Sequence, residues 1–142
     1  MSLKIKQIKA DIHLAKHCMS PIVNLFNDEA LYSQAAYHTE QATEKCLKVI
    51  LLQYYNIKEY DKRYRTHDIV VLLAYIRECS VKQGKSIPIK IPTIIDTLSV
   101  DIKEWEANSR YNDNMVILKD SIIKVIKACE KMYYELKKKK FL

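Results

Sequence analysis

Arg110, Tyr111, Asn112 and Asp113 form the stretch whose residue types best suit the binding of a phosphate. Asn112 or Asp113 is expected to cap the last helix, so Arg110 would stand just ahead of free backbone N–H groups. A guanidinium fork and the N–H groups of a helix N-terminus both suit phosphate oxygens. An ion pair between Arg110 and a local carboxylate, with Tyr111 packed into the protein, explains the same residues equally well. The residue types leave both interpretations open.

A second polar group lies on one arc of the segment 32–55, which contains no glycine or proline and is expected to be helical. Glu44 and Lys48 are four residues apart, in the order that favours an ion pair within a helix. Gln41 and Lys45 have the same spacing. From spacing alone, the preferred interpretation of this arc is a solvated face with ordinary helix pairs.

Basic and aromatic residues alternate in the next stretch, residues 56–65. Arg63 and Arg65 could hold phosphates while neighbouring tyrosines stack on a base. The preferred interpretation is a solvated loop whose tyrosines cover the end of the protein. Thr66 is expected to cap the helix that follows. His67, at that helix start, could act as a base, contact a phosphate or tie the helix to the loop.

The spacing of the histidines and cysteines gives little support for a metal site or for thiol chemistry. His13 and His17 are four residues apart, but zinc needs at least three protein ligands and the spacing indicates no third. The four cysteines, at positions 18, 46, 79 and 129, form no Cys-x-x-Cys pair and fall in helical patterns, which predicts buried, reduced thiols. The stretch 84–86 lacks the first glycine of a phosphate-binding loop and follows no strand. We therefore predict no metal site.

Apolar residues with helical spacing predict the elements that position these groups. The expected helices cover approximately residues 3–19, 32–55, 66–81, 93–109 and 113–136. The segment 32–55 should be the central helix, because its apolar face has small residues in the first half and bulky ones in the second. One glycine and three prolines in 142 residues argue for long helices with short connections. The prediction is one all-α domain over residues 1–142, an antiparallel up-and-down bundle of four long helices plus short extra helical segments.

The net charge of +7 permits binding to phosphates or nucleic acid without establishing it. Part of the excess is the run Lys137–Lys140, which suits a helix C-terminus and needs no ligand. No apolar run approaches the length of a membrane span, and the amino end has no apolar signal region. We therefore expect a cytoplasmic protein that does not enter a membrane.

Three pieces of the sequence together resemble the HEPN domain family. They are the segment 35–52, AAYHTEQATEKCLKVILL; the step Thr66-His67-Asp68-Ile69 that leads into two leucines; and Trp105 followed by Arg110-Tyr111. The resemblance covers roughly residues 5–135 and implies an all-α bundle. It also favours the structural role for His67.

The resemblance implies that a ribonuclease site is incomplete. Catalytic HEPN domains are metal-independent ribonucleases in which an arginine is followed, after four to six residues, by a histidine, and two copies of the motif meet across a dimer. Arg110 matches the arginine, but positions 115–117 are Met, Val and Ile, and no histidine follows His67. We therefore expect no ribonuclease activity.

The sequence looks most like the noncatalytic branch that resembles the substrate-binding subunit of small nucleotidyltransferases. That likeness implies a homodimer and a partner that is a minimal nucleotidyltransferase, as in toxin–antitoxin-like pairs. No cofactor is implied other than a nucleotide ligand such as ATP. The residues expected near the nucleotide or the shared interface are Arg110, Tyr111, Asn112, Gln41, Lys45 and Lys48, with His67, Arg63 and Arg65 as secondary contacts. Two alternatives stay open: a ribonuclease toxin that uses Arg110 with His67 or Tyr111, and a basic scaffold that contacts RNA or an acidic protein.

Overall fold

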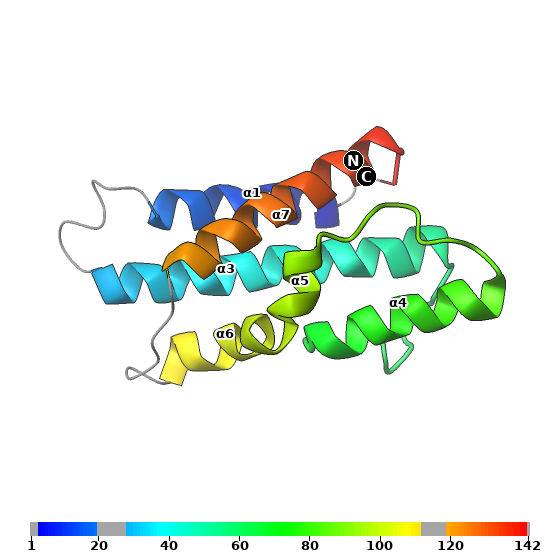
Figure 1. Ribbon diagram of the computed structural model, residues 1–142, viewed down its shortest axis with the longest axis horizontal. Helices are drawn as coiled ribbons and strands as arrows, with labels where there is room; N and C mark the ends of the chain where they lie inside the picture. The colour runs from blue at the N-terminus through cyan, green and yellow to red at the C-terminus, as the bar shows by residue number, and fades with distance from the viewer. Residues whose placement is uncertain (1–2, 20–27, 112–118, 142) are drawn as a thin grey trace.

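Helices form the regular structure in this computed structural model, which describes residues 3–19, 28–111 and 119–141 (Figure 1). In chain order the elements are α1 (Leu3–Cys18), α3 (Asp28–Val49), the π-helix η1 (Ile50–Tyr54), α4 (Ile69–Gln83), α5 (Thr93–Thr97), α6 (Ser99–Tyr111) and α7 (Lys119–Lys138). The described residues contain no strand. The predicted all-α bundle is confirmed.

Helix α3 is the central element, as its sequence predicts. It contacts α1, α4, α6 and α7, and Figure 1 shows it between the α1–α7 layer and the α4–α6 layer. Ala35, Ala36 and Ala42 are fully buried on its core face, where small side chains let other helices approach closely. Leu47, near the end of α3, and Ile50, the first residue of η1, are fully buried beyond them. Small residues thus precede large ones along the buried face of this segment, as predicted.

The apolar stripes predicted for the other helices also face the core. On α4 the buried stripe is Ile69, Leu72, Leu73 and Ile76; on α7 it is Ile122, Val125, Ile126, Cys129, Met132 and Leu136. All four cysteines are buried free thiols, as predicted. Burial raises the pKa of the Cys18 thiol, so this residue stays protonated and unreactive.

Three helix boundaries differ from the prediction. The central helix begins at Asp28, four residues before the predicted start at residue 32. The N-cap of α4 is Asp68, not Thr66. The Asp68 carboxylate accepts from the backbone N–H groups of Val70 and Val71 at 2.9 and 3.3 Å, while the Thr66 hydroxyl accepts from the Asp68 N–H at 3.1 Å. The predicted helix 93–109 is two helices, because Leu98 (φ −101°, ψ 13°) leaves the helical conformation between α5 and α6. The differences at Asp68 and Leu98 depend on local backbone hydrogen bonds, which the apolar pattern of a helix does not predict.

The end of the central helix is held by the loop that follows α4. The Lys85 ammonium donates to the Tyr54 carbonyl at 2.9 Å and lies 4.2 Å from the centre of the Tyr54 ring. The Tyr55 hydroxyl donates to the Lys85 carbonyl at 3.1 Å, and Gln83 donates to the Tyr55 carbonyl at 3.0 Å. These contacts satisfy carbonyl groups that the end of a helix leaves without intrahelical partners.

Gly84 lets the chain turn between Gln83 and Lys85, because it takes the left-handed conformation (φ 61°) just after α4. We expect Gly84→Ala to lower the free energy of unfolding by about 1 kcal/mol, the usual cost of a left-handed alanine. A Cβ at this position meets no atom within 4 Å, so the cost should come from the backbone alone. Urea denaturation measures it. Gly84→Asn is the matched control and should cost less, since asparagine tolerates this conformation; an equal loss would contradict the explanation.

Candidate functional site

Asp11 connects α1 to the polar arc of α3. Its carboxylate accepts from the Lys45 ammonium at 2.6 Å and from His38 Nδ1 at 3.0 Å. Burial by itself would raise the pKa of Asp11, but the hydrogen bonds from His38 and Lys45 outweigh it and hold the pKa below its ordinary value. Asp11 is therefore an ionised, buried group that holds two helices together.

Glu44 connects α3 to the start of α4. Its Oε1 accepts from the Lys48 ammonium at 2.7 Å and from His67 Nδ1 at 3.0 Å. Its Oε2 is buried and finds no hydrogen-bond partner among the described residues. The Lys48 ammonium also lies 5.2 Å from the centre of the Tyr64 ring. The predicted Glu44–Lys48 pair is thus present, and His67 contacts α3 from the residues just before α4.

The polar arc of α3 is mostly covered, so its preferred interpretation as a solvated face was wrong. The side chains of Lys45 and Lys48 are only 22% and 13% exposed. Gln41 and Lys45 have the same spacing as Glu44 and Lys48, but each binds another residue. Gln41 donates to Glu40 at 2.7 Å, and Lys45 donates to Asp11. The three residues predicted to lie near a nucleotide are thus engaged within the chain. Their nucleotide-binding role stays a prediction.

The basic loop divides into engaged and exposed residues. Arg63 pairs with Glu78 and lies 4.0 Å from the centre of the Tyr75 ring. Tyr64 is buried, as the covering role predicts, and burial raises its pKa to about 12. Arg65 is exposed. Tyr60 is also exposed, at 78%, so the predicted covering role was wrong for this tyrosine. Both arginines predicted as secondary contacts are thus exposed, and Arg63 is engaged by Glu78 within the chain.

Arg110 and Tyr111 lie in the last turn of α6, so the predicted end at residues 108–109 was too early. The C-terminus of a helix carries partial negative charge, which suits a cation but does not attract phosphate. The side chains of Arg110 and Tyr111, together with Asn112 and the predicted cap at 112 or 113, fall outside the described residues.

His67 lies near the first half of α6, whereas Arg110 lies in its last turn. The first half of α6 is fixed beside the start of α4, because Lys103 Nζ lies 3.1 Å from the Asp68 carboxylate. Arg110 follows seven residues later, about 10 Å along the helix axis. Figure 1 shows α6 running away from α4 in that direction. Within one chain, this geometry separates Arg110 from the histidine that an alternative ribonuclease site would use.

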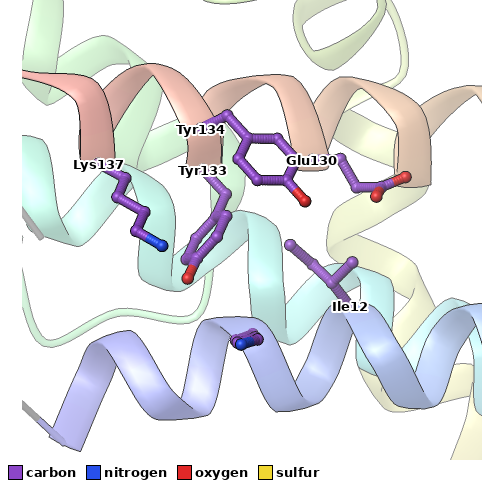
Figure 2. A pocket seen from close by; sticks show the side chains of 6 residues that line it. Ile12, Glu130, Tyr133, Tyr134 and Lys137 are labelled. Carbon is purple, nitrogen blue, oxygen red and sulfur yellow. The ribbon is translucent and has the colours of Figure 1, made fainter.

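A hollow between α1 and α7 was not predicted from the sequence. It has a volume of about 140 Å³ and is lined by Lys9, Ile12, Glu130, Tyr133, Tyr134 and Lys137 (Figure 2). A second hollow of about 290 Å³ is lined by Lys16, Met19, Ile123, Ile126, Lys127 and Glu130. Glu130 lines both hollows, so they are neighbours along the line where α1 and α7 meet, and the Lys16–Glu130 ion pair lies between them. The two hollows together are called here the α1–α7 groove. The two sides of the groove come from opposite ends of the sequence, so no local motif could reveal it.

The described residues offer no group of three or more His, Cys, Asp or Glu side chains that could hold a metal ion. His13 and His17 are both exposed on α1. Among the described helices, none is long and apolar enough to cross a membrane.

The HEPN domain family matches residues 11–139, which is most of the chain. The chain therefore belongs to the HEPN domain family, as the three sequence pieces imply. Comparison with curated proteins gives no significant match. Comparison with solved structures gives none either.

Proposed function

We propose that this protein is a noncatalytic HEPN module that binds a nucleotide, a minimal nucleotidyltransferase partner, or both, and acts as a homodimer. The observation that carries the proposal is the lack of an imidazole where a HEPN ribonuclease needs one. After Arg110 the required positions hold Met115, Val116 and Ile117, and the last histidine in the sequence is His67.

The surroundings of the histidines support this proposal. His67 Nδ1 and His38 Nδ1 each bond a carboxylate on another element, and the His67 side chain is 67% exposed. General acid–base catalysis requires a proton-transferring group within hydrogen-bond reach of the reacting atoms. Within one chain, a ring bonded to Glu44 at the start of α4 is poorly placed to assist an arginine at the far end of α6.

Calorimetry with ATP and GTP tests the nucleotide half of the proposal, and co-purification with a minimal nucleotidyltransferase encoded beside this protein tests the partner half. We expect binding in at least one experiment, and Arg110→Ala should weaken nucleotide binding. Gel filtration with light scattering should give the mass of a dimer. No binding in either experiment would remove the support for the proposal.

A ribonuclease assay separates the proposal from its main alternative. Intact RNA after incubation with the purified protein is the expected result. RNA cleavage that Arg110→Ala abolishes would overturn the noncatalytic role and show that another residue replaces the missing histidine. Cleavage unchanged in Arg110→Ala would indicate a contaminating nuclease.

A further inference from the structure

The α1–α7 groove has an apolar floor. Ile12, Ile126 and Tyr133 form its buried part, and Ile123 is partly exposed beside them. Tyr134 stands at its edge with 62% of its surface exposed. Figure 2 shows Tyr133 and Tyr134 on α7 above Ile12 of α1. From position 123 to position 137, the α7 side of the groove is about 21 Å long, or four turns of a docked helix.

The rim of the groove is positively charged. Lys9, Lys16, Lys127 and Lys137 line it and are all exposed. Glu130 is the only carboxylate among the lining residues, and Lys16 neutralises it at 3.1 Å. The acidic residue of α1, Asp11, is bonded to α3 and cannot offset this charge at the surface. An apolar floor between rows of lysines therefore selects for a ligand that is apolar on one face and acidic at its flanks.

We propose that the α1–α7 groove docks an amphipathic helix of another protein, with apolar residues on the face that enters the groove and Asp or Glu on both flanks. The inference rests on the proposed function as a binding module and deepens it, because it names the surface and the chemistry of a protein partner. A helix in a groove places anchors at positions i, i+3 or i+4, and i+7, which fits an elongated apolar floor.

Two other occupants fit the groove less well. A second copy docked through the same groove about a twofold axis would bring the same lysines against each other, on a chain of net charge +7. RNA would satisfy the lysines, but bases bind by stacking on aromatic faces, and most of this floor is aliphatic. An acidic helix satisfies both the rim and the floor.

The probe for a test is a designed 21-residue helical peptide with leucines on one face, glutamates on both flanks and a fluorescent label. Its matched control has lysines in place of the glutamates. Fluorescence anisotropy with the full-length protein should show binding of the acidic peptide only, and the affinity should fall as salt rises. In methyl NMR spectra, the signals of Ile12, Ile123 and Ile126 should shift, while that of Ile89 should not.

Two charge-reversal variants locate the binding. Lys9→Glu/Lys127→Glu should weaken the acidic peptide at least about tenfold. Lys62→Glu/Lys90→Glu changes the same net charge at exposed lysines that do not line the groove, and should leave the affinity within about twofold. All four lysines are exposed, so circular dichroism should show folded variants.

Failure of the acidic peptide to bind, equal binding of both peptides, or equal loss in both variants would overturn the inference. So would a single-stranded RNA oligonucleotide that binds through Lys9 and Lys127 while the acidic peptide does not. If a nucleotidyltransferase binds this protein but the Lys9→Glu/Lys127→Glu variant retains it and the peptide fails, the groove inference fails and the proposed function stands. If the peptide binds but neither nucleotide nor nucleotidyltransferase does, the proposed function fails and the groove inference stands.

Discussion

Replacing Asp11 by alanine is expected to lower the free energy of unfolding by about 3 kcal/mol. The substitution removes the acceptor for Lys45 and His38 and leaves their polar groups largely buried without a partner. Urea denaturation followed by circular dichroism measures the loss. Glu104→Ala, which removes an exposed carboxylate from α6, is the control and should cost less than about 0.5 kcal/mol. Equal losses would show that Asp11 does not hold α1 to α3.

The Asp11→Asn variant should show a characteristic pH dependence. The pKa of Asp11 in the folded protein lies below its ordinary value of 3.8, so the folded state binds this proton less readily than the unfolded state. The contribution of the carboxylate is therefore present above about pH 4 and is lost as the pH falls through the folded pKa. We expect the stability gap between wild type and Asp11→Asn to be full at pH 7 and to shrink below about pH 4. A gap that stays constant would contradict the assignment.

The second large effect is expected at Glu44. Glu44→Ala should cost about 3 kcal/mol, because it leaves the Lys48 ammonium mostly buried without its carboxylate. The double variant Glu44→Leu/Lys48→Met should recover most of this loss, since apolar residues of similar size need no ionic partner. A double-mutant cycle by urea denaturation measures the recovery. A double variant as unstable as Glu44→Ala would show that the two residues do not act as a pair.

An exposed pair with the same spacing provides the comparison. Glu78 and Lys82 on α4 are also four residues apart and lie 2.8 Å from each other, but the Lys82 side chain is 73% exposed. Lys82→Met should leave the denaturation midpoint unchanged within error, since solvent screens an exposed pair.

The Glu44→Leu/Lys48→Met variant also tests the predicted nucleotide-binding role of Lys48. If this variant binds a nucleotide as tightly as the wild type does, Lys48 acts in the fold and not as a phosphate ligand.

The sequence predicted which helix faces are buried, because apolar periodicity depends on local spacing. The stripe from Ile122 to Leu136 and the buried thiols are examples. It did not predict what covers the polar arc of α3. The i,i+4 rule describes pairs within one helix, whereas Asp11 and His67 reach this arc from other elements. The α1–α7 groove was missed for the same reason, since Lys9 and Lys137 come together only in the folded chain.

The π-helix at the end of α3 has a consequence for any helical-wheel drawing of this chain. In a regular α-helix, Tyr54 would sit one turn beyond Ile50, on the same side. Here the Tyr55 N–H donates to the Ile50 carbonyl at 3.2 Å, and it is Tyr55 that is buried, at 2% exposure, while Tyr54 is only partly covered. The phase of the pattern thus slips by one residue, or about 100° of rotation, within this turn. A single wheel drawn through residues 28–55 would therefore assign the two tyrosines to the wrong sides.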